Sequence, residues 1–271
     1  MDKTSGYIKT NGNIPGSAGG QHWLASFVDH RESYGPQTMQ AFMSMINPFQ
    51  TVVDIGAGGG RDLCIAKTVC PDAKTIAIEA STEYARNLSG IVNEVKIIDI
   101  ERDKLPFLDE SIDLFMANQV LEHTKEVFWI IHEISRSLKI GGHFIMSVPN
   151  IASFHNRILL LFGKHPTQAK LCSAHTRTFS KKDTLNFFKV CFPGGYELSA
   201  FAGSQFYPLP KIASRVMAKI LPNMSYSIFF MLKKLSPYKD EFIQFPIKAR
   251  LETNFYLGGK QTSQKYVKQS Q

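Results

Sequence analysis

No stretch of this 271-residue sequence is apolar for long enough to cross a membrane. Runs such as Ile158 to Phe162 and Ile228 to Leu232 fall far short of the ~20 residues that a membrane span needs. The cysteines lack the paired short spacings of metal-binding motifs, and no pattern typical of a secretory leader precedes them. They are Cys64, Cys70, Cys172 and Cys191. We therefore expect a soluble, cytoplasmic protein with reduced thiols and no metal site.

Acidic residues are scarce in the second half of the chain. Residues 1–150 hold 13 Lys and Arg against 18 Asp and Glu, whereas residues 151–271 hold 18 against 5. This asymmetry, within a net charge of +8, suggests that the second half meets an anionic partner. A phosphorylated substrate, a peripheral membrane contact and nucleic acid all fit. An ordinary solvated basic face fits equally well, because the cations are scattered.

The composition, 44% hydrophobic and 20% charged, is compatible with one α/β domain carrying elaborations. Glycine and proline breakers near the start predict a flexible segment, and helical periodicity follows it. The oligomeric state does not follow from the sequence. We divide the chain into a flexible N-terminal segment (1–21), an N-terminal helical lid (22–48), a ligand-binding core (49–150), an insertion and C-terminal part that covers the acceptor site (151–235) and a basic tail (236–271).

Short apolar strands alternate with helical stretches through the core. This alternation predicts an α/β fold with a mostly parallel sheet and helices on both faces. The last two strands are expected to form an antiparallel edge hairpin, joined by the connection 203–224. The expected strands are 51–55, 75–79, 95–98, 114–118, 144–148, 196–201 and 226–232, and the expected helices between them include 62–69, 83–92, 126–138, 152–161 and 181–189.

The first strand runs directly into a glycine-rich loop, residues 56–60 (Gly-Ala-Gly-Gly-Gly). Glycines allow positive φ and let a ligand approach the main chain. Arg61 occupies the place of the third glycine of a dinucleotide fingerprint, and no Gly-Lys-Ser/Thr follows, so nicotinamide and triphosphate loops fit poorly. Asp54, before the loop, suits a ligand with a positively charged amino group. Glu79 ends the second strand, where a carboxylate can accept both ribose hydroxyls or remain a solvated charge.

These residues resemble the first motifs of the class I S-adenosylmethionine-dependent methyltransferases, in which an acidic residue precedes Gly-x-Gly-x-Gly. Asp54, Gly56, Gly58 and Gly60 fit that motif. The resemblance covers residues 50–150 and continues through further short segments. They are Ile98-Asp99-Ile100, Leu105-Pro106-Phe107, Ser111-Ile112-Asp113, Val120-Leu121-Glu122-His123 and Leu138-Lys139-x-Gly141-Gly142.

This resemblance implies a Rossmann-like methyltransferase sheet with S-adenosyl-L-methionine as the cofactor. It implies that Asp54 and the loop face the methionine end, that Glu79 grips the ribose and that Asp99 bonds to the adenine amino group. The remaining cofactor contacts that it implies are with Ala57, with Ala80 against adenine, with the Ile100 amide and with Asn118 beside the sulfonium.

Two groups of polar residues are candidates for the acceptor chemistry. His123 can act as a general base with Glu122 assisting it, or the pair can cap and brace the next helix. His175 and Arg177 lie in the irregular segment that we expect to cover the acceptor. His175 is a second catalytic and substrate-binding candidate, and Arg177 can bind a phosphate or carboxylate or form a salt bridge that anchors the insertion.

The tail segments Ser147–Asn150, Asn156-Arg157 and His175–Ser180 resemble bacterial methyltransferases similar to the methionine-biosynthesis protein W group and to the type 11 and 23 groups. Many such proteins serve cell-surface glycan or other small-molecule pathways. We therefore expect methyl transfer to a small-molecule acceptor, on oxygen. The alternatives are an RNA-directed methyltransferase that uses the basic half, which no recognisable RNA-binding module supports, and a non-catalytic cofactor-binding accessory protein.

Overall fold

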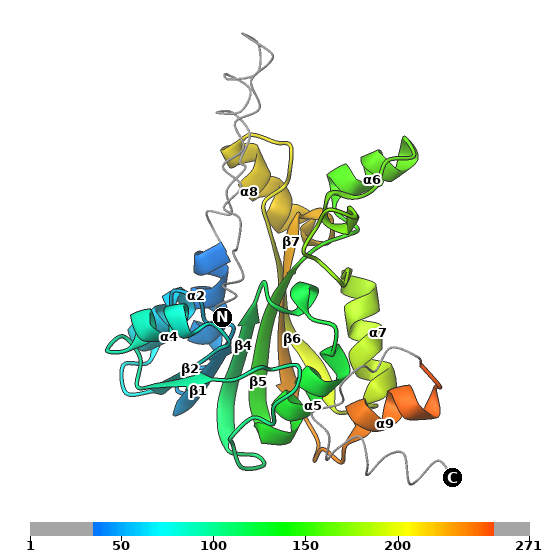
Figure 1. Cartoon of the computed structure of the whole chain (residues 1–271). Coiled ribbons are helices and arrows are strands. Elements are labelled where there is room, and N and C mark those ends of the chain that lie inside the picture. The colour runs from blue at the N-terminus through cyan, green and yellow to red at the C-terminus, as the bar shows by residue number, and fades with distance from the viewer. Residues whose placement is uncertain (1–34, 252–271) are drawn as a thin grey trace, which may run out of the picture.

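The computed structural model describes residues 35–251, so the expected segment 1–21, part of the lid and the end of the basic tail lie outside the described residues. Its centre is a seven-stranded sheet in the order β3-β2-β1-β4-β5-β7-β6 (Figure 1). The strands are β1 Thr51–Ile55, β2 Lys74–Glu79, β3 Glu94–Ile97, β4 Ile112–Asn118, β5 Leu138–Pro149, β6 Tyr196–Ser204 and β7 Ser227–Lys234.

Strands β1 to β5 pair in parallel, as the alternation predicts. Strand β7 is antiparallel to both neighbours, since it lies between β5 and β6. The expected antiparallel hairpin is therefore confirmed, with β6 at the edge of the sheet. This is the Rossmann-like arrangement that the resemblance implies. It places the carboxyl ends of β1, β2, β4 and β5 together on one side of the molecule.

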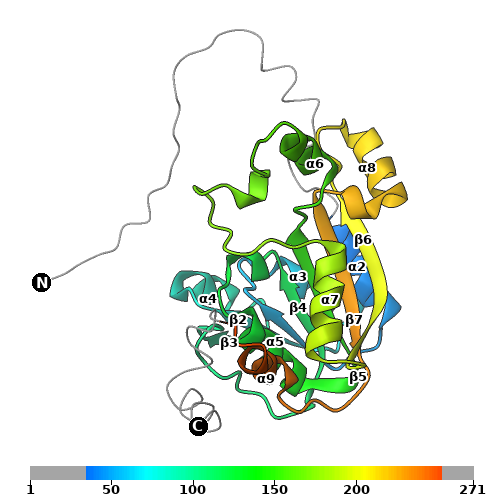
Figure 2. The ribbon, with the colours of Figure 1, turned by 90° about the vertical axis from the view of Figure 1, so that its right-hand side faces the viewer.

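Helices cover both faces of the sheet (Figure 2). The helices are α2 Gly35–Met45, α3 Arg61–Val69, α4 Thr82–Leu88, α5 Val127–Ser137, α6 Phe154–Leu161, α7 Lys181–Cys191, α8 Lys211–Ile220 and α9 Glu241–Lys248. Along β4, Phe115 packs in the cluster with α5, α7 and α9, whereas Leu114 and Met116 pack in the cluster with α2, α3 and α4. This period of two follows from the pleat, and it buries both faces.

Helix α2 begins at Gly35-Pro36, the breaker that the sequence marks, and proline is well placed in a first helical turn. It buries Met39, Phe42 and Met43 against the sheet and contacts α3 and β6. The described part of the expected lid therefore belongs to the core on one face.

Two helices lie where the sequence analysis places none. Helix α8 lies inside the expected connection 203–224, and α9 lies inside the expected basic tail, with Phe242 and Ile243 buried. Two other elements differ in length: α4 ends at Leu88, and β5 runs from Leu138 through Gly141 and Gly142. Within residues 35–251, none of the helices has the length and apolarity to cross a bilayer.

Candidate functional site

The glycine loop follows β1 and is held by the neighbouring strand. The amides of Gly56 and Ala57 both donate to the carbonyl of Ile78 in β2, at 2.8 and 3.2 Å. Gly56, Gly58 and Gly60 all have positive φ, between 51° and 75°. An added Cβ would lie 2.7 Å from Val120 at Gly56 and 2.5 Å from Leu88 at Gly60. Only glycine therefore fits these two turns without displacing a neighbour.

Gly58 differs from Gly56 and Gly60. A Cβ built on Gly58 meets no atom within 4 Å, so this part of the main chain opens onto free space. Beside this loop lies a cavity of about 220 Å³, between the loop, the start of α3 and the end of β4. Its lining residues are Asp54, Gly56, Ala57, Gly59, Arg61, Asp62 and Asn118.

Two carboxylates give this cavity a negative character. Asp54 is 3% exposed, and its burial, followed by the charge of Asp62, raises its pKa well above the usual range. The Asp62 carboxylate accepts hydrogen bonds from Asn118 Nδ2 at 2.7 Å and from Arg61 Nε at 3.0 Å. A cationic amino group beside Asp54 would supply the positive charge that favours its ionised form. The residues present therefore fit the methionine end of the expected donor.

The Glu79 carboxylate lies against the same loop. Its Oε2 accepts from the Gly58 amide at 2.9 Å, and its Oε1 accepts from the Ser81 amide at 3.1 Å. A carboxylate has about four acceptor positions, so two remain for hydroxyl donors. The structure thus brings together Asp54, the loop and Glu79, although they come from two strands. The ribose role of Glu79 stays a prediction.

The residues predicted to contact adenine follow β3. Asp99 is half exposed, and its Oδ1 accepts from the Glu101 amide at 3.0 Å. Ile100 packs partly against the core cluster on the α5 side of the sheet, and Ala80 is exposed next to Glu79. The Ile98 amide donates to the Glu79 carbonyl at 3.2 Å. The segment after β3 therefore lies beside Glu79, the residue predicted to bind the ribose. Their roles stay predictions.

The three catalytic candidates form one cluster after β4. The rings of His123 and His175 pack edge to face with 4.8 Å between their centroids. Glu122 is buried, and its Oε1 lies 3.9 Å from His123 Nε2. The Thr176 amide donates to the Glu122 carbonyl at 2.8 Å, which fixes the segment that carries His175.

The segment that carries Glu122 and His123 starts beside the donor loop, since Val120 packs on Gly56 and His123 follows three residues later. Burial, followed by the charge of His123, lowers the pKa of His175, so its imidazole is neutral at pH 7. Glu122, His123 and His175 offer ligand atoms that lie within 4.8 Å of one another and could hold a metal ion. The expected absence of a metal site stays a prediction.

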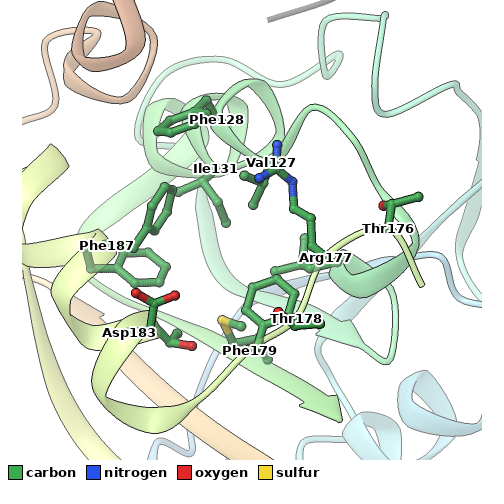
Figure 3. Close-up of a pocket in the computed structure, with 13 residues that line it drawn as sticks. Val127, Phe128, Ile131, Thr176, Arg177, Thr178, Phe179, Asp183 and Phe187 are labelled. Atoms are coloured by element: carbon green, nitrogen blue, oxygen red, sulfur yellow. The ribbon is translucent and has the colours of Figure 1, made fainter. Parts of the chain in front are cut away.

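Arg177 contributes to a second cavity, of about 340 Å³, between α5 and α7 (Figure 3). Its guanidinium donates to the carbonyl of Lys125, so a backbone group holds this side chain. Burial lowers the pKa of Arg177. The rest of the cavity is mostly apolar, and Asp183 is the acidic residue in its lining. The apolar lining residues include Leu121, Val127, Phe128, Ile131, Met146 and Phe187.

Several site residues were assigned no role from the sequence. Asp62 and Arg61 line the donor cavity, and the Ser147 hydroxyl donates to Asn118 Oδ1. Their signal is positional: Asp62 lies in the first turn after the loop, and Ser147 is the β5 partner of Asn118 in the parallel register. Three aromatic residues of the second half of the chain, Phe206, Phe229 and Phe230, are buried in the core.

Comparison with known proteins identifies the core of the chain. Residues 53–146 match the type 11 family model, described as a methyltransferase domain. An uncharacterized 37.1 kDa protein in a Streptomyces fradiae transposon is 30% identical over 107 residues, which cover 38% of this chain and 31% of that protein. Dimethylglycine N-methyltransferase of Parasynechococcus marenigrum is 28% identical over 124 residues, which cover 43% and 44%. The chain thus spans less than half the length of these curated relatives.

One solved structure with a similar fold is a complex from Haloferax volcanii between the Trm112 methyltransferase activator and a putative methyltransferase. Its TM-score is 0.56 at 16% identity, and the match covers 78% of this chain and 92% of that one. A possible histamine N-methyltransferase of Thermotoga maritima has a TM-score of 0.53 at 19% identity, covering 79% and 93%. At these identities the likeness shows the fold.

The family match, the strand order and the open glycine loop agree with one another. Residues 53–146 therefore form a type 11 methyltransferase domain, which the chain shares with S-adenosylmethionine-dependent methyltransferases of class I, and its cofactor is S-adenosyl-L-methionine.

Proposed function

We propose that this chain transfers a methyl group from S-adenosylmethionine to a hydroxyl oxygen of a small molecule, an activity of class EC 2.1.1.-. The observation that carries the proposal is the pairing of two imidazoles, His123 and His175, of which His123 follows three residues after Val120, the residue that packs on Gly56 of the donor loop. A hydroxyl acceptor must lose its proton as the methyl group arrives, and a neutral imidazole is a suitable proton acceptor.

The donor side supplies binding and alignment. The bare main chain at Gly58, the buried Asp54 and the Glu79 carboxylate would hold the amino-acid and sugar parts of the cofactor. When bound, the cofactor supplies an electrophilic methyl group on a sulfonium. Methyl transfer is an in-line displacement, so the protein needs mainly to orient the acceptor and to exclude water.

The acceptor side supplies the proton acceptor. His175 has a lowered pKa and a buried Nδ1 without a hydrogen-bond partner, so it packs against His123 as a neutral ring. His123 is more exposed and its Nδ1 lies 3.4 Å from the Ala174 carbonyl. We assign His123 as the group that meets the acceptor, with His175 and the Glu122 carboxylate holding its ring. Arg177, beside this cluster, is proposed to orient the acceptor.

An amine acceptor is the second candidate. It is favoured by the names of two relatives, dimethylglycine N-methyltransferase and the sarcosine/dimethylglycine N-methyltransferase of Halorhodospira halochloris, which is 27% identical over 118 residues. An amine can react from its neutral form, so it depends less on a protein base than a hydroxyl does.

A screen with isotopically labelled donor tests the proposal. Purified protein is incubated with acceptor panels grouped as hydroxyls, amines and carboxylates, and labelled products are identified by mass. We expect label in a hydroxyl compound, as an ether stable to mild base. Label confined to amines would replace the proposal with the second candidate. Label in total tRNA, with steep salt dependence, would point to an RNA acceptor.

A further inference from the structure

Helices α6 and α8 project together from one end of the molecule, beyond the edge of the sheet where β5 ends (Figures 1 and 2). They are joined by aromatic contacts near their bases. His155 of α6 stacks on Tyr226 with 5.3 Å between centroids, and Phe154 lies 5.6 Å from Phe206, which precedes α8. The two helices therefore form one surface, which we call the α6–α8 surface.

Helix α8 carries its apolar stripe on the outside. Ser214 and Ala218 are buried, and the Phe206 amide donates to the Ser214 hydroxyl at 2.6 Å, so this side of the helix faces the protein. Ile212, Val216 and Ile220 follow one another at intervals of four and are all exposed, with Ile212 at 82%. A helix on a globular domain normally turns such a stripe toward the core.

Helix α6 repeats this arrangement. Its inner side is fixed, since His155 Nε2 lies 3.0 Å from Thr167 Oγ1 and Asn156 Oδ1 accepts from the Thr167 amide at 3.0 Å. Its outer side and end are apolar and exposed. The exposed apolar residues there are Phe154, Ile158, Leu160, Leu161 and Phe162. Large exposed apolar patches of this kind mark a site of interaction.

The two sequence segments that carry these helices contain positive charges and no negative ones. Residues 150–182 and 198–239 contain no Asp or Glu. The cations on or next to the helices are Arg157, Lys164, Lys170, Lys211, Arg215 and Lys219. On α8 the cations at 211, 215 and 219 each precede a residue of the apolar stripe, so the two rows run side by side along the helix.

We propose that the α6–α8 surface docks on an anionic lipid bilayer. Aliphatic side chains beside a row of cations match the acyl boundary and the phosphate headgroups of such a membrane. A symmetric contact between two copies would bring the two sets of cations against each other, which disfavours a dimer through this surface. Nucleic acid would not use the aliphatic stripe. In the docked orientation, the edge of the sheet that carries the donor site faces the bilayer.

Vesicle flotation of the full chain tests this proposal. We expect binding to vesicles that contain phosphatidylglycerol, little binding to phosphatidylcholine alone, and weakening by salt. The double variant Ile212→Asp/Val216→Asp should lower the partition roughly tenfold or more, because it puts two charges into the apolar stripe. Leu108→Asp is the matched control, since Leu108 is 81% exposed and precedes β4, on the opposite edge of the sheet.

The cations are tested separately. Lys211→Gln/Lys219→Gln should weaken binding to phosphatidylglycerol vesicles by roughly thirtyfold while leaving the apolar stripe intact. Affinity for S-adenosylhomocysteine is measured in every variant and should not change, so a failure of the proposed methyl transfer would not be mistaken for a failure of docking.

Three results would overturn the proposal. They are absence of wild-type binding to the anionic vesicles, an equal loss in Leu108→Asp, and a dimer in light scattering that Ile212→Asp/Val216→Asp dissociates.

Discussion

The side-chain amide of Asn118 donates a hydrogen bond to the Asp62 carboxylate, with 2.7 Å between Nδ2 and Oδ2. This contact ties the end of β4 to the first turn of α3 across the donor cavity. The Asn118 carbonyl oxygen in turn accepts from the Ser147 hydroxyl of β5. Asn118 therefore positions the acidic wall of the cavity, in addition to lying beside the predicted place of the sulfonium.

Asn118→Ala should weaken binding of S-adenosylhomocysteine by roughly tenfold, because a buried carboxylate loses a hydrogen-bond donor worth about 1–3 kcal/mol. Calorimetric titration measures the change. Asn47→Ala is a matched control, since Asn47 Nδ2 donates to the Val69 carbonyl on the surface, and its loss should leave the affinity unchanged. Equal affinities for Asn118→Ala and the wild type would remove Asn118 from the donor site.

His123→Ala should lower kcat by roughly a hundredfold or more, with little change in affinity for S-adenosylhomocysteine, because general base catalysis contributes 10²–10⁴-fold. The readouts are single-turnover rates with labelled donor and calorimetry on the same variant. His123→Gln should keep the packing against His175 and still lose the rate. A wild-type rate in either variant would leave His123 as a structural residue of the turn before α5.

Chelation should leave the rate unchanged. The proposed proton acceptor, His123, needs a ring nitrogen with a free lone pair, which a bound ion would occupy. We expect protein dialysed against EDTA to keep its rate and elemental analysis to find no stoichiometric metal. A rate that falls on chelation and returns with one divalent ion would place a metal in the cluster of Glu122, His123 and His175.

Protonation of Glu133 should make the free energy of unfolding depend on pH. This residue is buried in α5, where Oε2 accepts from Arg136 Nη2 and from the Leu105 amide, both at 2.7 Å. Burial alone would raise the pKa of Glu133. Hydrogen bonds from His132 and Arg136 outweigh this effect and lower the pKa to about 2. The ionised form is therefore favoured in the folded state. Its stabilisation is present above the unfolded pKa, about 4.3, and is lost as the pH falls toward 2.

The loss should amount to about 3 kcal/mol in the free energy of unfolding between pH 6 and pH 2. Urea denaturation across this range measures it in the wild type and in Glu133→Gln. The variant should be less stable near neutral pH and should show a shallower decline in acid. Parallel curves for the two proteins would mean that Glu133 does not carry this dependence.

The donor half of the site could be predicted from the sequence because its signals are local. The strand ends at Asp54, Glu79 and Asn118 follow short apolar runs, and the glycine loop lies between a strand and a helix. The parallel pairing and the final antiparallel hairpin were also predictable, because strands that alternate with helices pair in parallel.

The acceptor half was less predictable, because its contacts join distant segments. His123 and His175 meet in space although 52 residues separate them. No sequence pattern predicts that the Arg177 guanidinium donates to the Lys125 carbonyl, and the role of Arg177 toward a substrate stays a prediction. Helix α8 was missed because its apolar residues point outward and prolines flank it, and α9 because Pro246 lies inside it.

The central claim is that S-adenosylmethionine lies against the bare main chain at Gly58. Calorimetric titration of S-adenosylhomocysteine into the wild type, Gly58→Val and Gly194→Val tests it most directly. Both glycines have positive φ and no atom within 4 Å of an added Cβ, so the two variants carry similar backbone strain. The account predicts tight binding to the wild type and to Gly194→Val and none to Gly58→Val. Unchanged affinity in Gly58→Val would contradict it.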